Sequence, residues 1–180
     1  MTCPIDNADV SDQDFLSFPE AALAVTRGRL PSADLEAMRA VLLLHRVTSA
    51  IVYDLESSVH RPAGWSWSSF RLLFTLWISG NLESKRAAAL SGMSRAAVSS
   101  LTKTLERGGL LARRTDPLDG RSVILKLTPT GARRFEEVFR EHNSRETSWM
   151  GELPDEDRAA IIRILLELNN TARSPWVKRR

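Results

Sequence analysis

The chain has 180 residues, of which 43% are hydrophobic and 26% charged, an ordinary composition for a globular protein large enough to bury a core. The sequence contains no apolar run long enough to span a bilayer and no basic-then-apolar signal at its start, so we expect a cytoplasmic protein without membrane contact. A single cysteine, Cys3, excludes an internal disulfide, and the three histidines lie too far apart in sequence to indicate a metal site.

Charge is unevenly distributed along the chain. Residues 1–20 contain five acids and no Lys or Arg, whereas residues 81–140 contain twelve Lys or Arg and six acids. The net charge of the whole chain is only +3. A local concentration of basic charge favours a phosphate-binding surface, although a solvated charged face would have the same composition.

The first thirty residues predict at most one short helix. Residues 1–14 are polar and acidic, which is typical of a disordered segment. Pro19 favours a helix start and Gly28 a helix end, so residues 19–27 can form a helix. A poorly ordered tail is an equally good interpretation, and the role of Cys3 within it stays open.

A long apolar helix is predicted over residues 33–60. Ser32 is its expected N-cap, and Asp34 and Glu36 place negative charge near the positive end of the helix dipole. Apolar positions cover much of its circumference, namely Leu35, Met38, Val41, Leu42, Leu44, Val47, Ile51, Val52 and Leu55. A helix this apolar needs cover on several sides, so we expect a second subunit against it.

Two short helices joined by a tight turn are predicted in the middle of the chain. They follow another apolar helix that starts at Ser66 or Ser68 and ends at Gly80. The first short helix covers residues 83–90, and the second begins at Ser94 and is ended by Gly108 and Gly109. One face of the second helix is apolar and the other is small and basic: Val98, Leu101 and Leu105 against Ser94, Arg95, Ser99 and Lys103. This pattern predicts a helix-turn-helix.

A β-hairpin and two further helices complete the prediction. Residues 110–115 and 122–127 read as antiparallel strands, joined by a loop of turn-forming residues, with a short third strand at residues 81–82. Thr128 caps a helix that runs from Pro129 to about Met150. Pro154 starts a last helix with almost no polar side, formed by Ile161, Ile162, Ile164, Leu165, Leu166 and Leu168. Such a surface indicates a subunit interface.

Several motifs in this region resemble those of the MarR family of winged-helix transcriptional regulators. They are Ser94-Arg95, Leu105-Glu106, Gly109-Leu110, Arg113-Arg114, Asp116-Pro117, Asp119-Gly120-Arg121 and Leu127-Thr128-Pro129-x-Gly131. Weaker similarity extends over residues 34–168. The resemblance implies a mainly α-helical fold with a small antiparallel β wing. Its parts would be an N-terminal extension (1–31), a helical dimerisation region (32–62 and 129–170), a winged helix-turn-helix domain (63–128) and a basic tail (171–180).

The resemblance implies double-stranded DNA as the partner, with the second helix of the helix-turn-helix in the major groove. The residues expected at DNA are Ser94, Arg95, Ala96, Ser99, Ser100, Lys103, Arg113, Arg114, Asp119 and Arg121. Arg95 can bind guanine or phosphate, and Arg121 at the wing suits the minor groove. A salt bridge from Arg121 to Asp116 or Asp119 that only shapes the turn is the structural alternative. Only one of Arg113 and Arg114 can face DNA from a strand.

Three of these residues depart from the usual family pattern. Ser99-Ser100 stand where relatives often carry Thr-Arg, and Lys103 stands where an acidic residue is common. The operator sequence therefore does not follow from the resemblance.

A ligand-binding cleft between the first long helix, the second helix and the winged domain is also implied. Candidate residues there are aromatic or cationic: His45, Arg46, Tyr53, Trp65, Trp67, Arg71 and Trp77. Such walls suit a small aromatic carboxylate or phenol. The alternative is that the tryptophans are core residues and the arginines are solvated.

These features predict a homodimeric, sequence-specific transcriptional repressor that binds a palindromic operator and is released by a small aromatic or phenolic ligand. The competing hypothesis is a DNA-bound architectural or partner-recruiting protein without an effector. The sequence contains no nucleophile motif, phosphate loop or metal-ligand spacing, so we expect neither enzyme activity nor a cofactor.

Overall fold

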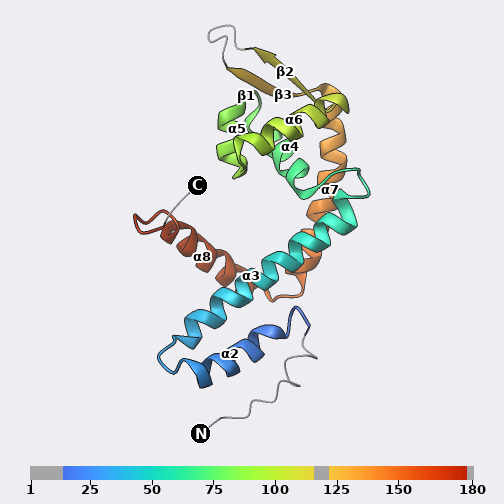
Figure 1. Cartoon of the computed structure of the whole chain (residues 1–180). Helices are drawn as coiled ribbons and strands as arrows, with labels where there is room; N and C mark the ends of the chain where they lie inside the picture. Colours follow the sequence, from blue (N-terminus) through green and yellow to red (C-terminus); the bar gives the residue numbers. More distant parts are fainter. Residues whose placement is uncertain (1–13, 116–121, 178–180) are drawn as a thin grey trace. The chain divides into compact units, whose positions relative to one another are not determined.

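The computed structural model describes residues 14–115 and 122–177, and it divides into two compact units, Met1–Leu72 and Leu73–Arg180. Figure 1 shows the elements in chain order. The first unit contains α2 (Phe18–Arg29), α3 (Leu35–Leu55), the π-helical turn η1 (Glu56–His60) and the start of α4 (Trp67–Ser79). The second contains the rest of α4, β1 (Leu82–Glu83), α5 (Ser84–Ser91), α6 (Arg95–Arg107), β2 (Leu111–Thr115), β3 (Val123–Leu127), α7 (Pro129–Gly151) and α8 (Asp155–Thr171). Within the described ranges, no helix is both long and apolar enough to cross a membrane.

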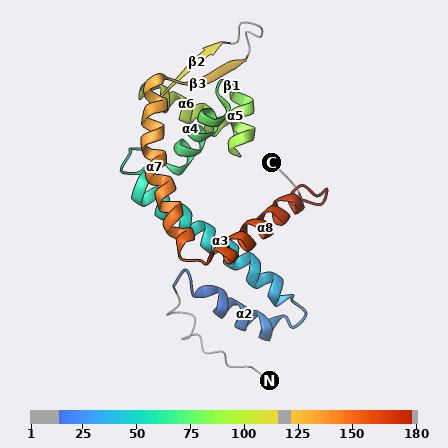
Figure 2. The same cartoon turned by 180° about the vertical axis from the view of Figure 1, so that it is seen from behind.

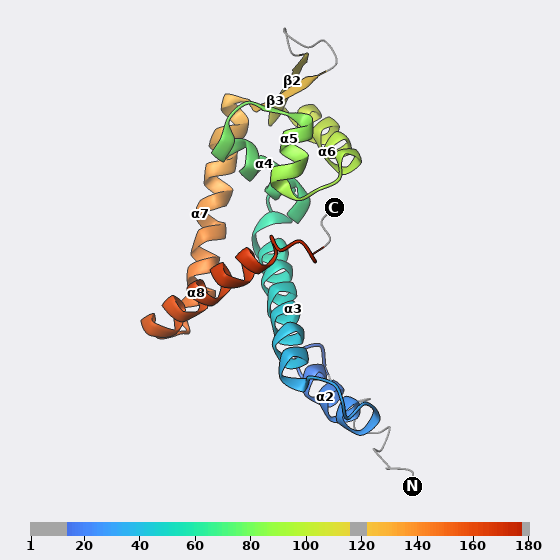
Figure 3. The same ribbon diagram turned by 90° about the vertical axis from the view of Figure 1, so that its left-hand side faces the viewer.

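The N-terminal extension forms a helix, α2, that lies beside the first half of α3 (Figure 3). Pro19 is in its first turn, as predicted, but Gly28 lies inside its last turn and does not end it. Pro19 and Leu23 are buried, and the Arg39 guanidinium reaches the Glu20 carboxylate at 2.7 Å. The interpretation of this segment as a poorly ordered tail was therefore wrong for residues 18–29, because α3 supplies an apolar surface for α2.

The long helix α3 begins later than predicted. Asp34, not Ser32, is its N-cap: the Asp34 side chain accepts a hydrogen bond from the Ala37 backbone N–H at 2.9 Å. The helical path continues to His60, as predicted, but its last five residues adopt a π-helix closed by the Arg61 N–H and the Glu56 carbonyl. This turn buries His60, whose ring stacks on Phe70 with centroids 4.3 Å apart.

The second unit has the predicted winged-helix elements. Its three strands pair antiparallel in the order β1-β3-β2, with Leu82 opposite Leu125 and Arg113 opposite Leu125 on the other side. The hairpin of β2 and β3 extends beyond α5 and α6 (Figure 2). The core beneath it consists of Leu73, Leu76, Ala87, Val98, Leu105, Leu111, Leu125, Phe135 and Val138.

The start of α7 is tied to the chain that leaves α6. Thr128 caps α7, as predicted: its side chain accepts from the Gly131 N–H at 2.9 Å and donates to the Gly109 carbonyl at 2.7 Å. The Thr128 N–H also donates to the Leu110 carbonyl at 3.1 Å. A Cβ atom at Gly131 would overlap that same carbonyl oxygen. Glycine at 131 is therefore required by the close approach of two backbone segments.

We expect Gly131→Ala to lower the free energy of unfolding by about 1–3 kcal/mol, the usual cost of inserting a methyl group into a packed site. Gly151→Ala is the matched control, since a Cβ there meets no atom within 4 Å. Urea unfolding followed by circular dichroism measures both variants. Equal stability of the two alanine variants would contradict this account of the junction.

Candidate nucleic-acid interface

The helix-turn-helix is formed by α5, a tight turn and α6. Gly92 has a positive φ of 64°, and its N–H and that of Met93 bond to carbonyls of the last turn of α5. Glycine is favoured in this conformation because it has no Cβ. Ser94 then caps α6 by accepting from the Ala97 N–H at 3.1 Å. These two caps set the direction in which α6 leaves α5.

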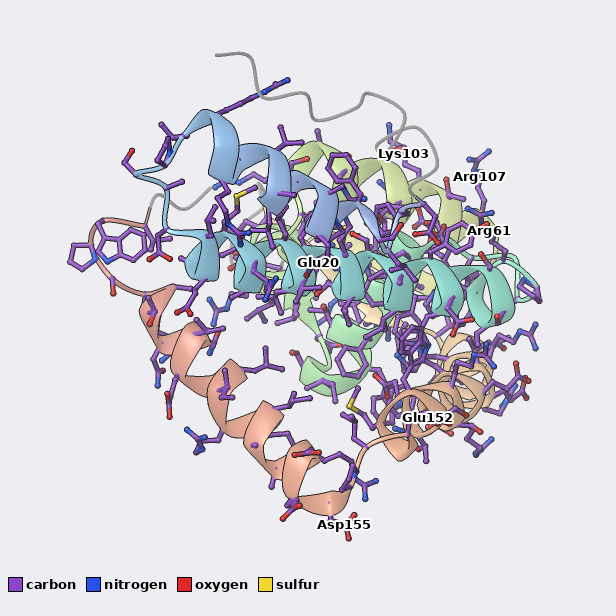
Figure 4. The ribbon with its side chains drawn as sticks, turned by 90° about the horizontal axis from the view of Figure 1, so that it is seen from below. Glu20, Arg61, Lys103, Arg107, Glu152 and Asp155 are labelled. Atoms are coloured by element: carbon purple, nitrogen blue, oxygen red, sulfur yellow. The ribbon has the colours of Figure 1, made fainter. Side chains whose placement is uncertain are left out.

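One face of α6 packs and the other is exposed. Val98, Thr102 and Leu105 are buried, and the predicted Leu101 is half-buried. All the predicted DNA residues of this helix are exposed: Ser94, Arg95, Ala96, Ser99, Ser100 and Lys103. Figure 4 shows Lys103 and Arg107 on the outer side of α6. The structure thus brings the six predicted side chains of this helix to one accessible surface.

The cations of this surface differ in their partners. Among the residues that the structure describes, Arg95, Lys103 and Arg114 form no side-chain ion pair or hydrogen bond. Arg107 folds back on its own helix, where its Nε donates to the Lys103 carbonyl at 3.3 Å. Arg113 is held by Glu106 of α6, with its NH2 nitrogen 2.6 Å from Glu106 Oε2. Three cations are therefore available to an anionic partner, and two are engaged within the chain.

The two wing arginines lie on opposite faces of β2, as adjacent residues of a strand must. Arg113 shares its face with the buried Leu111 and with Leu125, its register partner. Arg114 is paired in register with Ile124 on the other face and is exposed. The wing residues Asp116, Asp119 and Arg121, like Cys3, lie outside the described residues.

Two hollows flank the first turn of α6. One, of about 300 Å³, lies between α5, α6 and the wing and is lined by Ser84, Lys85, Arg95, Ser99, Thr102, Arg113, Ser122, Val123 and Leu125. The other, of about 630 Å³, is lined by Lys85, Ala88, Ala89, Gly92, Met93, Ser94 and Arg95. Lys85 and Arg95 border both hollows. Lys85 is ion-paired with Glu83 at 2.8 Å.

Sequence reasoning missed Ser84 and Lys85 as part of this surface. Their signal was present, because a serine and a lysine lie in the first turn of the predicted helix 83–90, where the helix dipole favours anions.

Most of the predicted ligand residues lie in the first unit and do not share one environment. His45 and Tyr53 are exposed on α3, whereas Trp65 is buried. Arg46 lies beneath the N-terminal segment, with its guanidinium carbon 4.1 Å from the centroid of the Phe15 ring and 5.2 Å from that of Phe18. This contact is a cation–π arrangement.

The remaining aromatic candidates are Trp67 in the first unit and Trp77 in the second. Trp67 stacks with His60 and Phe70 in the first unit. Arg71, four residues later on α4, is half-buried.

Trp77 lies in the second unit against Phe135 and Phe139, and its Nε1–H donates to Glu136 at 3.4 Å. The same cluster contains His142, whose ring stacks on Phe139 and lies 3.1 Å from Glu146. Burial lowers the pKa of His142, and the Glu146 carboxylate opposes that shift. His142 is therefore favoured in its neutral form.

Comparison with known proteins agrees with this geometry. The sequence profile of the MarR family matches residues 65–123. The chain is 30% identical over 134 residues to an uncharacterised HTH-type transcriptional regulator of Bacillus subtilis, YwaE, covering 74% of this chain and 78% of YwaE. It is 27% identical over 107 residues to the HTH-type transcriptional repressor YetL of the same organism, covering 58% of this chain and 64% of YetL.

Solved structures show the same fold. That of BpsR from Bordetella bronchiseptica, reported in work on the regulation of its DNA binding by 6-hydroxynicotinic acid, has a TM-score of 0.67 and 24% identity. The match covers 73% of this chain and 98% of BpsR. The helix-turn-helix, the three-stranded wing and the similarity to YwaE together identify the chain as a DNA-binding transcriptional regulator of the MarR family, and not an enzyme.

Proposed function

We propose that the protein is a homodimeric repressor that binds a palindromic operator through α6 and the wing and is released by a small aromatic acid or phenol. The observation that carries the DNA-binding part is the exposed face of α6, where Arg95 and Lys103 have no ion-pair partner among the described residues. An unpaired arginine near the start of a recognition helix can make a bidentate contact with guanine. Lys103, in the middle of the helix, suits a phosphate.

The proposal of a dimer rests on two apolar surfaces. Only Leu55 is buried on the 21-residue α3, and Val41, Leu44 and Val47 are 67%, 44% and 46% exposed. α8, which starts at Asp155 (Figure 4), has no buried residue. Its exposed apolar side chains are Ile162, Ile164, Leu165, Leu166 and Leu168. Surfaces this apolar are stable in water when a partner covers them, and a second copy of the chain offers the same residues.

The repressor and effector parts of the proposal rest on relatives. YetL is a repressor, and the DNA binding of BpsR is regulated by 6-hydroxynicotinic acid. In this proposal, residues 32–62 and 129–170 form the dimerisation region and residues 63–128 form the DNA-binding domain. The residues of the predicted cleft, including Tyr53, Trp67 and Arg71, contact the effector.

Selection of bound sequences from a random DNA library tests sequence-specific binding. We expect an enriched palindrome whose half-sites are about 10 base pairs apart, because two recognition helices in one dimer must enter successive major grooves. Light scattering should give one dimer for each selected site. Binding without sequence enrichment would support the architectural alternative and contradict the proposal.

Arg95→Ala should weaken binding to the selected site. A bidentate arginine–guanine contact contributes about 1–3 kcal/mol of discrimination, so the preference over scrambled DNA should fall by roughly 5- to 160-fold per half-site. Arg140→Ala removes the same charge from an exposed position on α7 and serves as the control. Fluorescence anisotropy with both DNAs measures the ratio. Equal losses in the two variants would assign Arg95 to non-specific charge alone.

Aromatic acids should dissociate the complex with the selected site. We expect 6-hydroxynicotinate, hydroxybenzoates or hydroxyphenylacetate at millimolar concentration to lower the anisotropy, because an effector must bind the DNA-free conformation more tightly than the DNA-bound one. Cyclohexanecarboxylate, which has the charge but no aromatic ring, is the control compound. If the whole panel leaves the complex intact, the effector part of the proposal is wrong and the DNA-binding part is unaffected.

A further inference from the structure

The ion pair between Glu106 and Arg113 joins the recognition helix to the wing. Glu106 lies in the last turn of α6 and Arg113 in the middle of β2. Arg113 Nε donates to Glu106 Oε2 at 2.7 Å, and its NH2 nitrogen lies 2.6 Å from the same oxygen. The side chains are 42% (Arg113) and 33% (Glu106) exposed. Both nitrogens of one guanidinium edge are thus directed at a single carboxylate.

The backbone between these two residues contains a pair of glycines. Gly108 and Gly109 separate α6 from β2, and Gly109 has a positive φ of 69°. The N–H groups of Gly108, Gly109 and Leu110 bond to carbonyls of the last turn of α6, and the Thr128 N–H bonds to the Leu110 carbonyl. The Glu106–Arg113 ion pair adds a direct side-chain contact between the helix and the middle of the strand.

The pairing of Arg113 also argues against a phosphate role. Its side chain is exposed and borders the same hollow as Arg95, but its charge is already compensated by Glu106. The Glu106 carboxylate that pairs with Arg113 would itself repel phosphates if α6 approaches DNA. Near the C-terminus of α6 this carboxylate is also disfavoured by the helix dipole. Arg114, which is also exposed but has no ion pair among the described residues, is the better phosphate ligand of the two.

We propose that Glu106 and Arg113 are positioning residues that hold the wing at a defined angle to the recognition helix, so that base contacts from α6 and groove contacts from the wing are made together. This inference rests on the proposed sequence-specific binding and deepens it. The Glu106–Arg113 pair then acts on specificity, which is measured as the ratio of the affinity for selected DNA to the affinity for scrambled DNA. Base contact is left to Arg95, and phosphate affinity to Lys103 and Arg114.

The variants Glu106→Gln, Arg113→Gln and the double variant test the pair. If the pair positions the wing, both single variants lower the affinity ratio at least fivefold, and the double variant is no worse than either, because all three break one contact. Glu106→Gln should at the same time bind scrambled DNA at least as tightly as wild type, with a steeper salt dependence, since it leaves one more cation unpaired.

Glu137→Gln breaks an exposed ion pair of the same type, Glu137–Arg134 on α7, and is the matched control. Exposed pairs contribute little to folding, and the urea midpoint of each variant verifies this. The proposal is overturned if Glu106→Gln strengthens and Arg113→Gln weakens binding to both DNAs with unchanged ratios, because independent phosphate effects would then explain both. If the wild-type protein does not prefer the selected site, the proposed sequence-specific binding is wrong. If the wild-type protein prefers it and the variants keep the same affinity ratio, only the positioning role of the pair is wrong.

Discussion

The close contact between the carbonyl oxygen of Leu110 and the start of α7 is the constraint on which the DNA-binding domain depends. Leu110 directly follows the glycines that end α6, its carbonyl accepts from the Thr128 N–H, and Gly131 lies too near for any side chain. Recognition helix, wing strands and α7 therefore meet at one backbone junction. The backbone of α7 at Gly131 is in direct contact with the Leu110 carbonyl, without an intervening side chain.

The charges of the domain fall into two groups with different physical roles. Lys85 and Arg113 are paired with Glu83 and Glu106 at distances under 3 Å. Arg95 and Lys103 have no such partner among the described residues. Exposed pairs are weak as stabilising elements but can set geometry. Net basic charge alone would make a protein that binds any DNA, so specificity requires that some cations be held and others be left to contact bases.

The N-terminal extension changes how α3 and its candidate ligand residues must be interpreted. Pro19 and Leu23 are buried, and Phe15 and Phe18 lie over Arg46, so this cation is part of the packing between α2 and α3. The same contact shields a guanidinium that the resemblance places in a ligand cleft. The apolar residues of α3 that α2 leaves exposed, such as Val41, are consistent with the proposed subunit interface.

The sequence by itself determined the order and type of nearly all elements, because their signals are local: glycines at 92, 108 and 109, the cap at Thr128, and the apolar spacing of Val98 and Leu105. It also determined which face of α6 is exposed. The choice of Asp34 over Ser32 as the cap of α3 was a local competition between two nearby candidates. Only the tertiary structure decided features that depend on contacts between distant residues. His60 was buried against Phe70, and Glu106 neutralised Arg113. Ring stacking and ion pairing are small energies that depend on three-dimensional neighbours, which a linear pattern does not contain.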